Sequence, residues 1–155
     1  MAGELTDLLD KEGVRYERLP HAHTERAADE AQALGVPAAE VGKTLVLTTP
    51  SGYARVVLPA SERLDLRKVA DFLGVGKKHV HLSTEDALAR DYPEFDLGAV
   101  PPLGGGRKDR VLIDRRLAEH ESVVVEAGSH DESLRLPTAE LVRLTGAEVA
   151  DLCKD

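Results

Sequence analysis

A single lysine precedes an apolar stretch in the sequence Val41-Gly42-Lys43-Thr44-Leu45-Val46-Leu47. The run that begins at Leu45 is flanked by threonines, and this composition is typical of a buried strand. Lys43 would then stand at the entry of that strand. An ammonium group at the rim of a sheet is suited to hold a phosphate or a carboxylate, and the alternative role is a salt bridge at the strand end.

The triplet Gly42-Lys43-Thr44 does not form a phosphate-binding P-loop. That motif requires Gly-x4-Gly-Lys-Ser/Thr between a strand and a helix. Position 37, where the first glycine is needed, is Pro37, and Gly35 comes two residues too early. The order of elements is also inverted, because a helical pattern precedes the triplet and a strand pattern follows it. The sequence therefore excludes an ATPase of this type.

Two glycine-containing turns offer further groups for chemistry. The segment Gly98-Ala99-Val100-Pro101-Pro102-Leu103-Gly104-Gly105-Gly106 combines two prolines, which fix the backbone, with four glycines, which let the backbone approach a ligand closely. The turn Gly128-Ser129-His130 follows a strand rich in β-branched residues. His130 is either a functional group of this turn or a structural hydrogen-bond donor.

No metal site and no covalent nucleophile are expected. His21 and His23, like His79 and His81, would share one face of an extended segment, but zinc needs three or four converging ligands and no further ligand motif accompanies them. The sequence contains no Gly-x-Ser-x-Gly elbow, and Cys153 lies close to the end of the chain. Since neither metal nor covalent catalysis is expected, the sequence favours non-covalent chemistry around Lys43 and the two turns.

Composition narrows the class of protein. A chain of 155 residues with 42% hydrophobic content suits one domain, and no apolar run approaches the length of a membrane span. The first residues lack a signal pattern and Cys153 is the only cysteine, so we expect a cytoplasmic protein. The formal net charge of −8 argues against a broad grip on nucleic acid. Local basic clusters remain available for a polyanion, with a solvated surface as the alternative: Arg63/Arg67/Lys68, Lys77/Lys78/His79 and Arg107/Lys108/Arg110 with Arg115/Arg116.

The element pattern predicts an α+β fold. Thr24, Asp65 and Thr138 are expected to cap helices, and Gly13, Gly35 and Gly74 to end them. Helices are predicted over residues 5–9, 26–34, 66–73 and 139–144, with a further helix beginning near 85. Strands are predicted over 14–19, 41–47, 53–58, 79–82, 110–114, 122–127 and 134–136. Because helices and strands are interleaved and one hairpin is present, a mixed sheet or partly closed barrel fits better than a doubly wound fold.

Several of these features occur together in one order and resemble the YbaK/prolyl-tRNA synthetase editing-domain family. They are Thr24 before an Ala-rich helix, Gly35-Val36-Pro37, Lys43-Thr44-Leu45, Gly98-x-x-x-Pro102-Leu103-Gly104, Asp114, Ala127-Gly128-Ser129-His130 and the closing Leu144-Thr145-Gly146-Ala147-Glu148-Val149. The likeness covers nearly the whole chain, so we expect a single domain over residues 1–155. No segment remains that could form the catalytic core of a synthetase. It implies a free-standing domain with a mixed, mainly antiparallel, barrel-like sheet flanked by helices.

The resemblance also implies an activity: hydrolysis of the ester that joins a wrong, small amino acid to tRNA, with tRNA(Pro) charged with Ala, Cys or Ser as the expected substrate. It requires no cofactor. Its partner is the acceptor end of tRNA, with a synthetase as a further candidate, and neither DNA nor a membrane is expected. A module that binds aminoacyl-tRNA or a synthetase without turnover is the alternative. The expected catalytic residues are Lys43, Gly98 and His130, and the expected substrate-binding residues are Thr24, Leu45, Val100, Pro101, Pro102, Gly104, Asp114, Gly128 and Ser129.

Overall fold

The structure is a computed structural model that describes residues 2–24 and 26–155. In chain order its helices are α1 (Ala2–Lys11), α2 (Ala27–Leu34), the 3-10 turn η1 (Ala38–Glu40), α3 (Leu66–Leu73), η2 (Lys77–His79), α4 (Glu85–Asp91), α5 (Arg115–Ala118) and α6 (Thr138–Thr145). Its strands are β1 (Glu17–Pro20), β2 (Val41–Thr49), β3 (Gly52–Pro59), β4 (His81–Leu82), β5 (Arg110–Asp114), β6 (Ser122–Ser129), β7 (Glu132–Pro137) and β8 (Glu148–Ala150).

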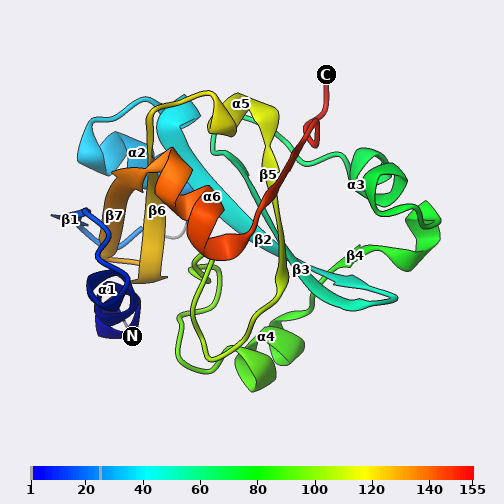
Figure 1. The fold of residues 1–155 in the computed structure, drawn as a ribbon, viewed down its shortest axis with the longest axis horizontal. Coiled ribbons are helices and arrows are strands. Elements are labelled where there is room, and N and C mark those ends of the chain that lie inside the picture. Colours follow the sequence, from blue (N-terminus) through cyan, green and yellow to red (C-terminus); the bar gives the residue numbers. More distant parts are fainter. Residues whose placement is uncertain (1, 25) are drawn as a thin grey trace.

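All strands of the described residues belong to one mixed sheet, in the order β1-β7-β6-β2-β3-β5-β8, with β4 paired to β2. Four strand pairs are antiparallel (β1 with β7, β7 with β6, β2 with β3, β2 with β4) and three are parallel (β2 with β6, β3 with β5, β5 with β8). Figure 1 shows β2 and β3 crossing the molecule diagonally, between the β6–β7 hairpin on one side and α3 on the other. The predicted α+β class with a mainly antiparallel sheet is confirmed.

Alternating apolar residues divide the strands between two faces of the sheet. On one face, Val57 and Val125 pack with residues of α1, α5 and α6 in the main core. On the opposite face, Val41 and Val124 pack under α2, and Leu58 packs under α3. The sheet is therefore covered on both sides, and a polar side chain on either face must lie near a helix or loop.

Several predicted helix boundaries are confirmed. Asp65 caps α3 by accepting hydrogen bonds from the Arg67 and Lys68 amides, and α4 begins at Glu85, as predicted, with the Thr84 side chain accepting from the Ala87 amide. Gly35 and Gly74 end α2 and α3 in the left-handed conformation. These are short-range signals, so the sequence alone carries them.

Other predicted boundaries were wrong. Thr24 does not cap α2: Arg26 occupies the N-cap position, because the backbone of Thr24 is bonded to His130. Thr138 is the first residue of α6, which follows β7 directly. Residues 14–16 do not join β1, since the Val14 amide closes α1 onto the Leu9 carbonyl.

Residues 79–82 divide into the η2 turn and the two-residue strand β4. The short elements α5 and β8 were not predicted. Within residues 2–24 and 26–155, no helix is both long and apolar enough to cross a membrane.

Candidate active site

Lys43 lies in a row of polar residues that crosses three strands. The parallel pairs Val41 with Val124 and Gly42 with Val125 place Lys43 and Glu126 one step further along β2 and β6, on the face that α2 covers. Glu126 is in turn the cross-strand partner of Ser133 on β7. The Lys43 ammonium donates to the Glu62 carbonyl oxygen at 2.7 Å, and burial lowers the pKa of this half-buried lysine. The strand pairing thus places Lys43 and Glu126 on the same face of the sheet, while the Lys43 ammonium itself turns toward Glu62.

His130 closes this row from the turn after β6. Its side chain is buried, with the residue 5% exposed, and its Nε2 lies 2.5 Å from the Leu97 carbonyl oxygen. Because a carbonyl only accepts, Nε2 carries the proton of this bond. The other ring nitrogen, Nδ1, lies 3.7 Å from Glu126 Oε2. In this arrangement His130 ties two loops together, and its Nε2 does not act as a proton acceptor.

Gly98 lies directly against His130, in a turn closed by the Ala99 amide and the Asp96 carbonyl. As the third residue of this turn Gly98 has a φ of +81°, which a type II turn requires and a glycine adopts freely. A Cβ at Gly98 would lie 3.5 Å from His130 Cε1. The Asp96 amide also donates to the Gly128 carbonyl at 2.9 Å. The structure therefore brings together Gly98, Gly128 and His130, as the sequence predicted.

Thr24 contacts the His130 turn through its backbone. Its amide donates to the His130 carbonyl at 2.9 Å, and the His21 amide donates to the Asp131 carbonyl at 3.0 Å. The His23 ring packs edge-on against the His130 ring, with centroids 5.2 Å apart. Ser129 Oγ donates to Asp131 Oδ1 at 2.7 Å, so this hydroxyl is bonded within the turn itself. The segment before α2 thus lies along the β6–β7 turn.

A buried carboxylate on α2 joins these parts. Glu30 is 1% exposed and accepts a hydrogen bond from the fully buried Ser133 hydroxyl, whose oxygen lies 2.9 Å from His21 Nε2. Burial raises the pKa of Glu30, against the opposing effects of the Ser133 bond and of the His21 and His130 charges. Glu30 therefore links α2 to β7 and to the segment that carries Thr24. The sequence reasoning missed Glu30, Glu126 and Ser133, because they belong to no short motif.

The remainder of the glycine-proline loop lies on the opposite face of the sheet. Arg55 of β3, 1% exposed, donates to the Pro101 carbonyl at 2.9 Å and to the Gly104 carbonyl at 2.7 Å, and pairs with Asp109 at 3.0 Å. Val100 packs with Val46 in a small apolar cluster. Arg55 was not predicted as a site residue, although one charged residue within the apolar stretch from Tyr53 to Leu58 was a usable signal.

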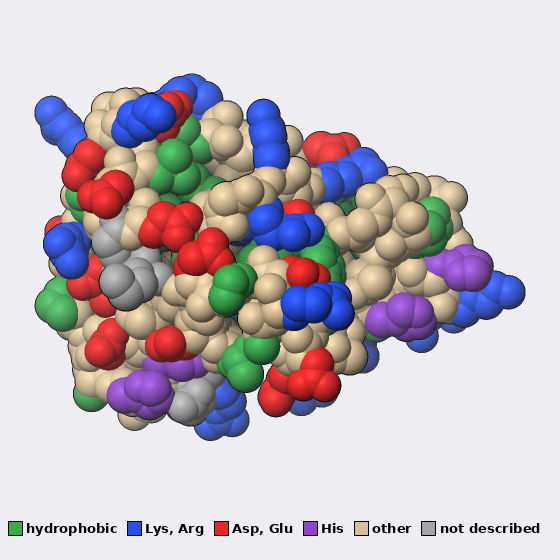
Figure 2. Space-filling model, turned by 90° about the horizontal axis from the view of Figure 1, so that it is seen from below, with side chains coloured by type: hydrophobic (Ala, Val, Ile, Leu, Met, Phe, Trp, Pro, Cys, Tyr) green, Lys and Arg blue, Asp and Glu red, His purple; other side chains and the backbone are tan. Residues whose placement is uncertain are grey.

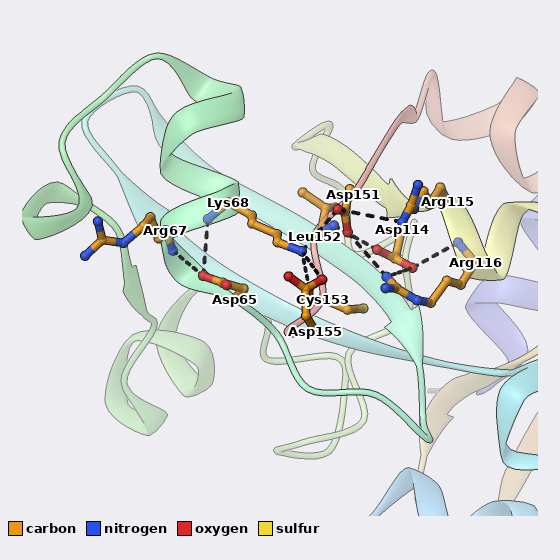
Figure 3. Close-up of polar contacts among 10 residues, drawn as sticks. All are labelled: Asp65, Arg67, Lys68, Asp114, Arg115, Arg116, Asp151, Leu152, Cys153 and Asp155. Atoms are coloured by element: carbon orange, nitrogen blue, oxygen red, sulfur yellow. Dashed lines mark hydrogen bonds and ion pairs between the residues drawn. The ribbon is translucent and has the colours of Figure 1, made fainter.

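Pro102 and Gly104 line a separate cleft of about 600 Å³ between this loop, α1 and the end of α6. Leu45 lies two residues beyond Lys43 on the same face and packs at the edge of the α3 cluster. Asp114 lies with Leu152 and Cys153 near the end of the chain (Figure 3), where its Oδ1 accepts from the Leu152 amide at 2.8 Å. Of the predicted binding residues, the His130 turn therefore gathers Thr24, Gly128 and Ser129, and Val100, Pro101, Pro102, Gly104 and Asp114 have contacts elsewhere.

Charge is unevenly spread over the surface. On the face in Figure 2, acidic side chains gather over one half, where histidines and basic side chains also lie, and further histidines with basic side chains lie at the opposite end of the molecule. That end is formed by α3, η2 and β4, where Lys77, Lys78, His79 and His81 are exposed. Among the described residues, no group of three or more His, Cys, Asp or Glu side chains is arranged to hold a metal ion.

In class, this is an α+β protein in which a histidine, a glycine turn and a buried carboxylate lie near the end of β6, with a lysine on the neighbouring strand β2. The aminoacyl-tRNA editing domain family matches residues 21–144, most of the chain. The protein therefore belongs to that family.

Solved structures of similar proteins agree with this assignment. A protein described as a candidate trans-editing enzyme for prolyl-tRNA synthetase is 28% identical, with a TM-score of 0.86 over 99% of this chain and 97% of that chain. The hypothetical protein APE2540 is 26% identical, with a TM-score of 0.87 over 97% of this chain and 99% of that chain. A scaffold protein used for computational grafting of epitopes is 27% identical, with a TM-score of 0.85 over 99% of this chain and 97% of that chain.

Proposed function

We propose that the protein is a trans-editing deacylase that hydrolyses mischarged tRNA carrying a small amino acid, with Ala-tRNA(Pro) as the preferred substrate and Ser- and Cys-charged tRNA as lesser ones. The observation that carries the proposal is the gathering of Gly98, Gly128 and His130 at the end of β6, on the strand next to Lys43, in a chain of the editing-domain family. The candidate trans-editing enzyme for prolyl-tRNA synthetase, similar in fold, supports the choice of tRNA.

The first step is binding of the acceptor end. The Lys43 ammonium, held at the Glu62 carbonyl, would contact a phosphate or the terminal adenosine. The exposed basic residues of η2 would contact the RNA body, which agrees with a protein of net charge −8 that has only local positive surface. The protein then contacts the nucleic acid at few points, and the turns at Gly98 and His130 position the ester.

The chemical step needs charge stabilisation more than a strong nucleophile, because an aminoacyl ester is already activated. Among the described residues the Gly98 amide makes no hydrogen bond to another protein group, so it is available to the developing oxyanion. One such donor is worth about 3 kcal/mol in well-studied hydrolases. Water attacks the ester, assisted by the ribose hydroxyl of the substrate. His130 holds the Gly98 turn through Leu97 and is a positioning residue for this step.

A small substrate is supported by the close approach of two turns. The Gly98 turn and the Gly128–His130 turn present backbone close together, which leaves little space for a large side chain. Apolar walls distinguish ligands that differ by one methylene by about 1–3 kcal/mol, so selectivity among small amino acids is modest.

The test is a panel of tRNAs charged with Ala, Ser, Cys, Phe or Leu, followed by release of the amino acid. We expect Ala-tRNA(Pro) to be cleaved fastest and the Phe and Leu esters slowest. Fastest cleavage of a large amino acid would contradict the small pocket. Tight binding of every substrate with no release would identify a binding module instead.

A further inference from the structure

The position of the Lys43 ammonium depends on a neighbouring chain segment. Its hydrogen bond at 2.7 Å goes to the carbonyl of Glu62, in the connection between β3 and α3. A lysine side chain has four rotatable bonds, so its charged end is fixed only where a partner holds it. Whatever orders the connection around Glu62 therefore also orders Lys43.

That connection is held by residues 151–155, which we call the strap. The Asp65 amide donates to the Leu152 carbonyl at 2.8 Å, and the Lys154 amide donates to the Arg63 carbonyl at 2.8 Å. Between these two bonds, Leu64 and Cys153 form an antiparallel bridge. The strap thus runs beside the connection as a short extra strand, one to three residues from Glu62.

Two side chains fasten the strap to the rest of the protein. Asp114, fully buried at the end of β5, accepts from the Leu152 amide at 2.8 Å. Lys68 of α3 donates to the Cys153 carbonyl at 2.8 Å and pairs with Asp151 and Asp155 (Figure 3). Asp114 and Lys68 approach the strap from two different elements, so its path is determined on both sides.

The groups around Lys43 are consistent with a positioning role for the strap. The titratable groups that lie near Lys43 are Glu62, Arg63 and Cys153. Burial raises the pKa of the Cys153 thiol to about 12, so this thiol is neutral and contributes no counter-charge at neutral pH. The Glu62 carbonyl is then the group that orients the ammonium directly.

We propose that Asp114 and Lys68 are positioning residues for Lys43: they fix the strap, the strap fixes the connection that carries Glu62, and the Glu62 carbonyl aims the ammonium at the substrate. The proposal rests on the proposed function insofar as Lys43 contacts aminoacyl-tRNA. It gives Asp114, which the sequence placed among the binding residues, an effect on the site without contact to the substrate.

The test compares Asp114→Ala, Asp114→Asn and Lys68→Met with the wild type. A misplaced catalytic group costs about tenfold to a hundredfold in rate, so we expect Asp114→Ala and Lys68→Met to lower kcat by about tenfold or more. Asp114→Asn keeps the Oδ1 acceptor for the Leu152 amide and loses the Oδ2 acceptor for the Arg116 amide, so it should retain more activity than Asp114→Ala. Thr84→Ala, which removes the cap of α4, is the control for a general loss of stability.

A second measurement does not depend on turnover: the titration of Lys43, followed by NMR of its side-chain carbon next to the ammonium. Since burial lowers the Lys43 pKa, loosening the strap should move the titration midpoint up toward the ordinary value of 10.5 in Asp114→Ala and Lys68→Met. If Asp114→Ala does not fold, Lys68→Met still applies, because the Lys68 side chain is 23% exposed.

An unchanged Lys43 titration in the folded variants would overturn the proposal, as would an equal shift in Thr84→Ala. If the wild type itself releases no amino acid, the proposed function fails, and the titration still decides whether the strap positions Lys43.

Discussion

Gly98 has a positive φ and lies against His130, so a side chain at this position is strained and enters the space of the site. Strain at such a φ costs about 1–2 kcal/mol for an L-residue. We predict that Gly98→Val lowers deacylation by about tenfold to a hundredfold, since loss of one oxyanion donor has effects of that size or larger. Affinity for tRNA should not change, because the exposed basic residues lie elsewhere.

Gly74→Val is the matched control. Gly74 also has a positive φ, of +73°, but among the described residues no group beyond its chain neighbours lies within 4 Å of its Cβ position. This variant should lose comparable stability in urea denaturation and keep its turnover. An equal loss of turnover in the two variants would mean that backbone strain, and not the site, is responsible.

Glu30 gives stability a predictable dependence on pH. Burial raises its pKa above the ordinary 4.5, so the folded state holds the proton more tightly than the unfolded state. The contribution of this group to the free energy of unfolding is therefore complete below that ordinary pKa and is lost as the pH rises through the raised pKa.

Glu30→Gln cannot ionise, and it should become more stable relative to the wild type as the pH is raised from about 4 to about 7. Chemical denaturation at a series of pH values measures this difference. Glu140→Gln on the surface of α6, where Glu140 pairs with Arg143, is the control and should show little change. A constant difference between Glu30→Gln and wild type would show that burial does not raise the Glu30 pKa.

At the scale of elements, Arg55 fixes the path of the loop that follows Gly98. It is buried, donates to two loop carbonyls and pairs with Asp109, whose side chain is 7% exposed. Removing one partner of a buried ion pair costs about 3–5 kcal/mol, a large part of the stability of a typical domain. We predict that Arg55→Met lowers the free energy of unfolding by about that amount and reduces turnover through the displaced loop.

Arg110→Met is the control for Arg55→Met, because Arg110 forms an exposed ion pair with Glu148. Exposed pairs contribute about 0–1 kcal/mol, so urea denaturation should separate the two variants clearly. A loss below about 1 kcal/mol for Arg55→Met would contradict the role of Arg55 as the anchor of the loop.

The elements show what a sequence can and cannot reveal. The hairpin of β2 and β3, the cap at Asp65 and the start of α4 near residue 85 depend on neighbouring residues, and they were predicted correctly. The prediction that Thr24 caps α2 was wrong because the Thr24 amide donates to the carbonyl of His130, more than a hundred residues away. Pro101 and Gly104 were predicted to bind substrate together with Gly98, whereas Arg55 holds their carbonyls on the other face of the sheet.

Pairing between distant segments also determines parts of the candidate site that the sequence could not predict. Lys43, Gly98 and His130 lie in recognisable motifs, so the sequence could propose them as site residues. Glu126 shares a face of the sheet with Lys43 because β2 pairs in parallel with β6. Such pairing joins segments that are distant in the sequence, and no local pattern records it.

At the scale of the whole molecule, the account requires no metal ion. Turnover is assigned to a lysine, a backbone amide and water, and the described residues contain no group suited to bind a metal. We predict that dialysis against a strong chelator leaves both turnover and the melting temperature unchanged. Activity that disappears on dialysis and returns only with zinc would contradict this and would bring His21 and His23 into the chemistry.

The central claim is that this chain hydrolyses a mischarged tRNA at a site built around Lys43. The most direct measurement is the rate of alanine release from Ala-tRNA(Pro) by the wild type and by Lys43→Ala, with thermal melting of both proteins. We predict that Lys43→Ala loses about a hundredfold or more in rate, since loss of a charge-stabilising group has effects of that size. Its melting temperature should stay close to that of the wild type, because a half-buried lysine at the start of β2 contributes little to the core. Full activity of Lys43→Ala, or no release of alanine by the wild type, would contradict the account.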